Sequence, residues 1–386
     1  MDVASALMKF EFFVLAPNDW NGQRMNRQQL FSRFARYSPI IYSNGLKHTW
    51  ELINITNILS NPISHFEQCE DVQVDRPSSL LLRYKKLKFY DNIVLRAYSN
   101  HLTSRKNSNK KSILYIFHPQ FKEYVHTIKH DILVYHPYDD FSKQGEGFSQ
   151  HVSDEKYLVE KADIVITPSA GLSNNLINKY HRMNIKTVHN GVDFKAFSHY
   201  ANKTINNQIK EPAKKRVGYI GSINVKVDIE MLLYLATRFP DVSFELIGPV
   251  GVMDNKKTAF EQLKNMDNVI LWGSKPYDEL PQLTAAMDCL LMCYDTSPEL
   301  WAGLAYPLKL NEYLAVKVPV ISCDLPSVPE LNSLVDVATT HQQWATSLTE
   351  ILTGNYSKQD TGFLYAAKQD WNARVTEIAR LLNEIN

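Results

Sequence analysis

The chain has 386 residues, of which 44% are hydrophobic and 22% charged, and its formal net charge is +1. This length exceeds what one ordinary hydrophobic core holds, so two domains are predicted. The near-neutral charge argues against a dedicated nucleic-acid-binding protein, and no apolar run approaches the roughly 18 residues of a membrane span.

The cysteines and the first residues indicate the compartment. Cys289 and Cys293 fall in one strand-like run, where they would lie roughly 13 Å apart, too far for a disulfide. Cys69 and Cys323 complete the set, so we expect reduced thiols. No signal peptide is evident, and a cytoplasmic protein is expected.

Short apolar runs alternate with helical segments in the first half of the chain. Strands are expected near residues 10–16, 39–43, 112–118, 131–136, 163–168 and 186–189. Helices are expected near residues 26–36, 79–102, 120–128, 154–161 and 172–181. Continuous apolar strands suit a parallel sheet that is covered on both faces, and the alternation predicts a doubly wound α/β fold.

The same pattern restarts after a polar interval at residues 200–215. Strands are expected near residues 216–220, 243–247, 269–272, 289–293, 318–322 and 335–338. Helices are expected near residues 229–239, 277–287, 307–315, 341–352 and 371–386. We therefore predict two Rossmann-like domains facing across a cleft, with ligands at the carboxyl ends of the strands.

The segment from Tyr306 to Ala315 carries the clearest chemical signal. Pro307 suits the first position of a helix, whose free amides favour an anion such as phosphate. Lys309 adds a positive charge, and Glu312 lies one turn further on the same side. Phosphate and sugar hydroxyls of a nucleotide sugar would need this combination. An amphipathic helix with a solvated Lys–Glu pair is the alternative.

Glycines end three predicted strands of the second half. Gly221 would let backbone approach a phosphate closely, and Gly248 and Gly273 end the two strands that follow. Asn190 and Gly191 follow the last strand of the first half, where the pair predicts either a plain tight turn or a ligand contact.

Short motifs occur in a defined order and spacing along both halves of the chain. The first half has Trp20 and Arg27 after its first strand, Tyr-His-Pro-Tyr-Asp-Asp at 135–140, Ala-Asp-Ile-Val-Ile-Thr-Pro-Ser at 162–169 and Asn-Gly-Val-Asp at 190–193. The second half has Gly-Tyr-Ile-Gly at 218–221, Phe-Glu-Leu-Ile-Gly-Pro at 244–249 and Pro307…Lys309…Glu312. Together they resemble the GT-B glycosyltransferases, especially the family-4-like enzymes of capsule, teichuronic acid and exopolysaccharide synthesis.

The resemblance implies a division of the chain. An acceptor-binding Rossmann-like domain would span residues 1–199, a linker 200–215 and a nucleotide-sugar-binding Rossmann-like domain 216–365. The last segment, 366–386, would cross back to the first domain as a helix.

The resemblance also implies a donor site. Glu312 would hold the ribose diol, while the helix opened by Pro307, with Lys309, would hold the diphosphate. Asn311 would also contact the donor. The phosphate would be lined from the other side by Gly221, Ser222 and Lys226, although Lys226 also fits an exposed loop lysine.

One departure from the pattern of these glycosyltransferases bears on the stereochemistry of sugar transfer. Many relatives have a second glutamate where this chain has Leu304, and Glu299 is near it only in sequence. A retaining hexosyltransferase is expected, and an inverting outcome stays open.

Catalytic candidates follow the strand at 131–136. Asp139 is the first candidate for a catalytic group and His136 the second, because a carboxylate or histidine can deprotonate an acceptor hydroxyl. In a retaining reaction the leaving phosphate could do this instead. Asp140 is a third candidate, and it also fits a helix cap. The acceptor side would be completed by Trp20, Arg27 and His118.

No metal or other cofactor is expected, because His126, His130 and His136 do not converge by spacing. The expected partners are a nucleotide sugar and a glycan or lipid-linked acceptor, with no nucleic acid. Basic clusters near Lys85 and Lys110 stand beside apolar residues. They predict either peripheral contact with the inner face of the cell membrane or an ordinary solvated surface.

The function expected from these residues is transfer of a sugar in bacterial surface polysaccharide synthesis. A sugar-nucleotide epimerase of the same architecture and a non-catalytic nucleotide-binding scaffold are the alternatives. A nicotinamide dehydrogenase is disfavoured, because no Gly-x-Gly-x-x-Gly follows the first strand.

Overall fold

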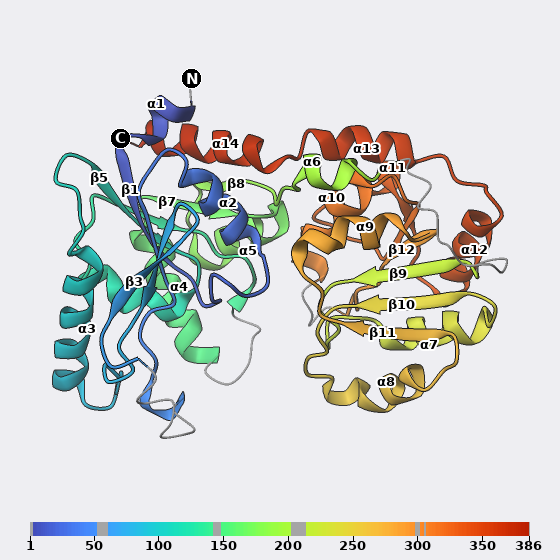
Figure 1. The fold of residues 1–386 in the computed structure, drawn as a ribbon, viewed down its shortest axis with the longest axis horizontal. Coiled ribbons are helices and arrows are strands. Elements are labelled where there is room, and N and C mark those ends of the chain that lie inside the picture. Colours follow the sequence, from blue (N-terminus) through green and yellow to red (C-terminus); the bar gives the residue numbers. More distant parts are fainter. Residues whose placement is uncertain are drawn as a thin grey trace. The chain divides into compact units, whose positions relative to one another are not determined.

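The computed structural model describes residues 3–51, 61–141, 148–201, 214–297, 302–304 and 306–385 (Figure 1). Two compact units divide the chain: unit 1 is Met1–Val188 with Arg374–Asn386, and unit 2 is His189–Ala373. The division falls before His189 rather than after residue 199. Most of the linker expected at 200–215 lies outside the described residues.

Unit 1 contains an eight-stranded sheet in the order β3-β4-β2-β1-β5-β6-β7-β8. The strands are β1 (Phe10–Leu15), β2 (Ile40–Ser43), β3 (His65–Cys69), β4 (Val72–Arg76), β5 (Lys111–Ile116), β6 (Ile132–Tyr135), β7 (Ile164–Thr167) and β8 (Ile185–Thr187). All neighbours are parallel except β3, which pairs antiparallel with β4. The β3–β4 hairpin was not predicted, because β3 is a polar, largely exposed edge strand without a continuous apolar run.

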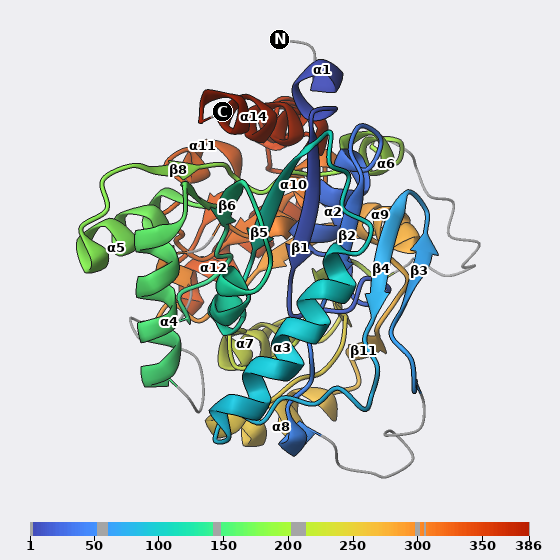
Figure 2. The same ribbon diagram turned by 90° about the vertical axis from the view of Figure 1, so that its left-hand side faces the viewer.

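Helices cover both faces of this sheet. They are α1 (Val3–Leu7), α2 (Asn26–Phe34), α3 (Lys88–Thr103), α4 (Phe148–Lys161), α5 (Ala170–Tyr180), α14 (Trp371–Glu384) and the 3-10 helices η1 (Thr49–Glu51) and η3 (Pro119–His126). Because side chains alternate along a strand, Phe12 packs on α2 through Phe31 and Phe34, whereas Phe13 joins the core formed with α3, α4 and α5. Figure 2 shows α3 on the outside of this unit.

Three helix predictions in unit 1 need correction. The helix expected at 79–102 begins only at Lys88, because the preceding loop is held by other bonds, such as that from Arg83 N to Lys47 O. The segment expected as a helix at 120–128 is a 3-10 helix, and α4 begins at Phe148, ahead of the expected residue 154.

Unit 2 contains a six-stranded parallel sheet in the order β11-β10-β9-β12-β13-β14. The strands are β9 (Arg216–Ile220), β10 (Ser243–Ile247), β11 (Val269–Gly273), β12 (Cys289–Met292), β13 (Val320–Ser322) and β14 (Asp336–Val337). The first strand, β9, lies between β10 and β12. The strand order therefore reverses there, and such a switch point is where doubly wound sheets bind ligands.

The helices of unit 2 pack on both sides of its strands, and Figure 1 shows α9 and α10 on one side and α7 and α8 on the other. They are α6 (Phe194–Ser198), α7 (Ile229–Arg238), α8 (Lys257–Lys264), α9 (Leu280–Ala285), α10 (Leu308–Ala315), α11 (Leu331–Leu334), α12 (His341–Leu352), α13 (Gln359–Ala367) and the 3-10 helices η5 (Asp254–Lys256), η6 (Tyr277–Glu279) and η7 (Ala302–Leu304). The start of α12 matches its prediction because Thr340 and Gln343 form a capping box.

Candidate functional site

The switch point of unit 2 brings the start of α10 to the end of β9. Pro307 is the N-cap of α10 and not its first helical residue, because its ψ of 136° is extended. Its carbonyl oxygen still accepts a hydrogen bond from Leu310 N at 3.2 Å. The first amides of α10 have no partner within the helix, so this end favours an anion.

Gly221 and Lys309 meet closely at this point. A Cβ atom on Gly221 would lie 2.5 Å from Lys309 Nζ, and Gly221 has a φ of +147° that other residues rarely adopt. The Lys309 ammonium lies 3.7 Å from the centre of the Tyr219 ring and 5.0 Å from that of Tyr294. Aromatic faces stabilise a cation in this way, so the lysine is held at the strand end before any ligand arrives.

We expect Gly221→Ala to remove nucleotide binding. The added methyl group would displace the Lys309 ammonium and force a strained backbone, since an L-residue rarely takes this φ. Isothermal titration with a nucleoside diphosphate would measure the loss. Gly303→Ala is the matched control, because a Cβ atom there meets nothing within 4 Å; equal losses in both variants would contradict the prediction.

Lys309 and Glu312 both have perturbed protonation. Burial lowers the pKa of Lys309 to about 7, although the nearby Cys293 and Glu312 oppose this. Burial also raises the pKa of Glu312 to about 7, while Lys309 and a long hydrogen bond of 3.5 Å from the Tyr277 hydroxyl oppose it. Two ionisable groups of opposite sign that are poorly solvated are typical of a ligand site.

Tyr313 and Asn311 form hydrogen bonds within the protein that hold α10 in place. The Tyr313 hydroxyl accepts from Ile220 N at 2.8 Å and donates to Ile220 O at 3.2 Å, which fixes α10 to the end of β9. Asn311 is fully buried and donates to Asn190 O at 3.0 Å. The amide expected to contact the donor is therefore used within the protein.

The predicted turn at Asn190 belongs to the same network. Asn190 Nδ2 donates to Tyr306 O at 2.8 Å, and the Tyr306 ring stacks on His189 at 4.4 Å between ring centres. A Cβ atom on Gly191 would lie 2.8 Å from Gln369 O, so glycine is required by close packing. Sequence alone did not reveal that this turn supports the start of α10.

The loop after Gly221 carries the remaining donor candidates. Ser222 O accepts from the Tyr219 hydroxyl at 2.9 Å, and Lys226 O accepts from Asp295 N at 2.9 Å. Lys256, which the sequence did not single out, donates to Val225 O and Val227 O and so fixes this loop. Leu304 lies in η7, whereas Glu299 is outside the described residues.

In unit 1, His136 directly follows β6 and its side chain is buried. Its Nδ1 atom lies 2.7 Å from the Tyr115 hydroxyl, and its ring stacks on Phe117. Burial, aided by Arg27, lowers the pKa of His136 to about 3. A histidine with this pKa is a weak general base at neutral pH.

The two aspartates that follow are also nearly buried. Asp139 Oδ1 accepts from Asp140 N at 2.8 Å, and Asp140 Oδ2 accepts from Asn175 Nδ2 of α5 at 3.4 Å. Asp140 is thus linked to α5, and both aspartates remain candidates for a reacting group.

Trp20 and Arg27 follow β1, and His118 follows the neighbouring strand β5. Arg27 is 1% exposed, its guanidinium carbon lies 4.5 Å from the centre of the Tyr138 ring, and it donates to Asn18 Oδ1. Its Nε and Nη1 atoms have no hydrogen-bond partner among the described residues. His118 caps η3, with a pKa lowered to about 3 by burial. Trp20 packs edge-on against Tyr42.

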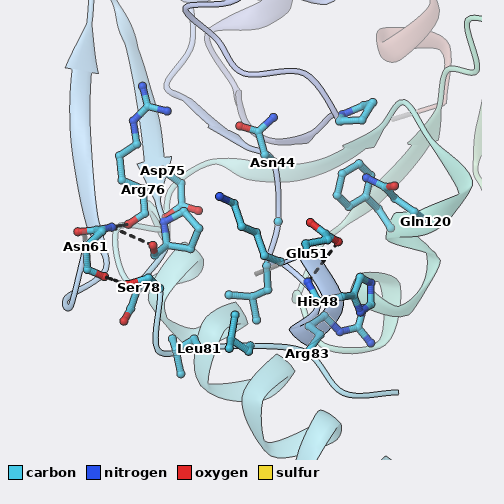
Figure 3. A pocket seen from close by; sticks show the side chains of 18 of the residues that line it. Asn44, His48, Glu51, Asn61, Asp75, Arg76, Ser78, Leu81, Arg83 and Gln120 are labelled. Atoms are coloured by element: carbon cyan, nitrogen blue, oxygen red, sulfur yellow. Dashed lines mark hydrogen bonds between the residues drawn. The ribbon is translucent and has the colours of Figure 1, made fainter. Parts of the chain in front are cut away.

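A pocket of about 710 Å³ opens at the carboxyl ends of β1, β2 and β4 in the same unit (Figure 3). Asn44, Arg76 and Gln120 are among its polar lining residues, while Leu81 and Phe121 are apolar. Its size suits a small ligand. The sequence did not indicate this pocket, because β4 was not predicted and its lining residues form no contiguous motif.

Among the described residues, no group of three or more His, Cys, Asp or Glu side chains could hold a metal ion. None of the helices in the described part of the chain is long and apolar enough to span a bilayer.

Residues 214–384 match the family described as Glycosyl transferases group 1. Over 183 residues the chain is 31% identical to a Bacillus subtilis (strain 168) protein described as a teichuronic acid biosynthesis glycosyltransferase, TuaH. That match covers 46% of this chain and 45% of TuaH, so it spans less than half of either protein.

Solved structures match almost the whole chain. Sucrose-phosphate synthase from Thermosynechococcus elongatus has a TM-score of 0.74 at 15% identity, covering 97% of this chain and 99% of that one. Anabaena HepE in complex with UDP and glucose has a TM-score of 0.70 at 16% identity, with the same coverage of both chains. At such identities the likeness establishes the fold.

Proposed function

We propose that this chain, which carries a glycosyl transferases group 1 domain on a GT-B fold, moves a sugar from a nucleotide donor to a glycan acceptor in surface polysaccharide synthesis. The observation that carries the proposal is the contact between Gly221 at the end of β9 and Lys309 at the start of α10. It joins a close backbone approach, a helix N-terminus and a cation at one switch point.

The donor side follows from this geometry. Lys309 and the first amides of α10 would bind the diphosphate, and the Glu312 carboxylate, one turn further on, would accept hydrogen bonds from the ribose diol. HepE was solved with UDP and glucose, which makes UDP the first nucleotide to test. Positive charge from Lys309 and α10 would act on the leaving diphosphate, so we propose transfer without a metal ion or other cofactor.

The acceptor side would lie in unit 1. We place a sugar unit of the acceptor in the polar pocket of Figure 3, near the loops that carry Trp20 and His118. We propose hexosyl transfer with retention. The low pKa of His136 makes this histidine a weak base, so Asp139 or the departing phosphate would take the acceptor proton. The free thiols Cys289, Cys293 and Cys323 support a cytoplasmic location.

Nucleotide binding with and without Glu312 tests the donor site. UDP, GDP, dTDP, CMP and ADP are titrated into the purified protein in the presence of EDTA. One nucleoside diphosphate should raise the melting temperature, and Glu312→Ala should weaken its binding roughly tenfold or more, because a charged hydrogen-bond acceptor is lost.

The control for this titration is Glu350→Ala, which removes an exposed glutamate of α12 in the same unit. Equal affinity in Glu312→Ala and the wild type would contradict the donor site. Nucleotide binding without transfer to any glycan would favour a scaffold, and epimerisation of the nucleotide sugar without an acceptor would favour an epimerase.

A further inference from the structure

Six large apolar side chains are exposed within one short stretch of unit 1, here called the 80–93 surface. Phe89 is 78% exposed, Leu87 56%, Leu80 54% and Ile93 51%. Tyr84 and Tyr90 complete the set. These residues occupy the loop before α3 and its first turns, which lie on the outside of unit 1 (Figure 2). Soluble surfaces rarely cluster so many large apolar groups without a partner.

A buried ion pair holds this loop in place. Arg83 is 1% exposed and donates to both carboxylate oxygens of Asp91 in the first turn of α3, and it also pairs with Glu123. Tyr84 N donates to Asp91 Oδ1 at 2.9 Å. The exposed side chains are therefore presented by a fixed backbone, and the acidic Asp91 is consumed inside the protein.

The charges at the 80–93 surface are positive. Lys86 and Lys88 are exposed, and Lys85 is partly exposed, 3.9 Å from Glu123. Apolar and aromatic side chains beside lysines are the composition of surfaces that bind anionic lipid, with rings in the interface and ammonium groups among the headgroups.

The second basic cluster, near Lys110, differs from the first in the contacts of its lysines. Lys106 Nζ donates to Ser112 Oγ, and Lys110 Nζ donates to Met8 O, so both lysines hold the unit together. This cluster follows the far end of α3, 16 residues from its start, which is roughly 24 Å along a helix. The two clusters are thus separate. The one near Lys85 adjoins six exposed apolar side chains, whereas Lys110 adjoins the exposed Met8.

The pocket at the end of the unit 1 sheet shares residues with this segment. Leu81, Leu82 and Arg83 line it directly after Leu80 (Figure 3). A molecule anchored in a membrane at the 80–93 surface would have its headgroup next to this pocket.

We propose that the 80–93 surface docks this protein on an anionic lipid bilayer, with Phe89 and Leu87 entering the interface and Lys85, Lys86 and Lys88 contacting acidic headgroups. Docking would bring a lipid-linked substrate to the adjoining pocket. It does not depend on the sugar-transfer chemistry, so it can fail or hold independently of the proposed function.

Vesicle co-sedimentation of the full chain tests the proposal. We expect binding to vesicles of phosphatidylglycerol and phosphatidylcholine, and little binding to phosphatidylcholine alone. Each lysine near the surface contributes about 1 kcal/mol, or about fivefold, so Lys→Gln at positions 85, 86 and 88 should weaken binding on the order of 100-fold. Phe89→Ser should weaken it separately, and added salt should weaken wild-type binding.

Matched controls separate this surface from general stickiness. Met183 is 79% exposed in the same unit, so Met183→Ser should bind like the wild type. Lys→Gln at the exposed positions 129, 156 and 161 should lower binding far less than the change at 85, 86 and 88. Thermal melting followed by circular dichroism reports whether each variant remains folded.

Three outcomes would overturn the proposal. The first is a wild-type protein that ignores anionic vesicles, and the second is equal loss of binding in the control and test variants. The third is self-association in sizing experiments that Phe89→Ser abolishes while vesicle binding persists, which would assign the surface to a second copy of this chain.

Discussion

Lys309→Met is expected to lower affinity for UDP on the order of 100-fold while making the ligand-free protein more resistant to heat. The ammonium is placed by Gly221 and the Tyr219 ring, so its removal costs one charged contact with the diphosphate, about 2–3 kcal/mol. Burial disfavours the same charge in the ligand-free protein, where it lowers the pKa of Lys309 to about 7.

The two shifted pKa values predict how the stability of the protein changes with pH. The pKa of Lys309 is about 7 in the folded protein and near 10.5 in the unfolded chain, so the unfolded chain binds more protons between these values. Wild-type stability should therefore rise from pH 7 towards 10.5, and Lys309→Met should lack this rise. Glu312 acts below pH 7: its raised pKa means that stability falls as pH increases from 4.5 to 7.

Calorimetric melting between pH 5 and 10, without and with UDP, would measure both effects. Lys257→Met is the control, because Lys257 is an exposed lysine of α8 in the same unit. Unchanged UDP affinity in Lys309→Met would remove this lysine from the phosphate site. A flat pH response in the wild type would contradict the shifted pKa values of Lys309 and Glu312.

Asp139→Asn is expected to reduce sugar transfer on the order of 100-fold and to leave UDP affinity unchanged. Asp139 would either accept the acceptor proton or stabilise positive charge at the anomeric carbon, and both roles need the negative charge that asparagine lacks. The proposed donor residues lie in unit 2, whereas Asp139 follows β6 in unit 1.

Transfer rates with saturating donor, together with UDP titration, would separate these effects. Asp140→Asn is the informative neighbour, because Asp140 is tied to Asn175 and should mainly affect stability. Wild-type transfer by Asp139→Asn would rule out Asp139 as the catalytic group. The anomeric configuration of the product would then decide whether the leaving phosphate acts alone.

Apolar periodicity was sufficient to predict the two parallel sheets. The segments expected at 243–247 and 341–352 coincide with β10 and α12, because Gly248 and Pro249 directly after the strand and a capping box at the start of the helix are local signals. The β3–β4 hairpin was not predicted, for the opposite reason. Pairing with β4 holds β3 in place, and the polar residues of β3 give no local signal for a strand. The start of α3 was placed too early because Arg83 and Asp91 form their ion pair only in the folded protein.

The position of two proposed donor residues agrees with the sequence pattern, whereas their contacts could not be read from it. Lys309 and Gly221 were named as a helix residue and a strand-end glycine, and the structure brings them together. Asn311, by contrast, looked like a ligand contact, although its amide is bonded to Asn190, a residue far away in sequence. Burial of His136 and Arg27 and the pocket beside β4 depend on tertiary packing, so no local pattern could reveal them.

The ends of unit 2 are joined to each other. Val192 N donates to Gln369 O, and Trp371 N donates to Val192 O, so the first and last segments of this unit pair side by side. In topological terms unit 2 is an insertion in unit 1, entering and leaving through adjacent strands of chain. A domain whose two ends are neighbours can be exchanged between proteins while the domain that carries it stays folded. On this fold, the proposed choice of donor in unit 2 can therefore change in evolution separately from the choice of acceptor in unit 1.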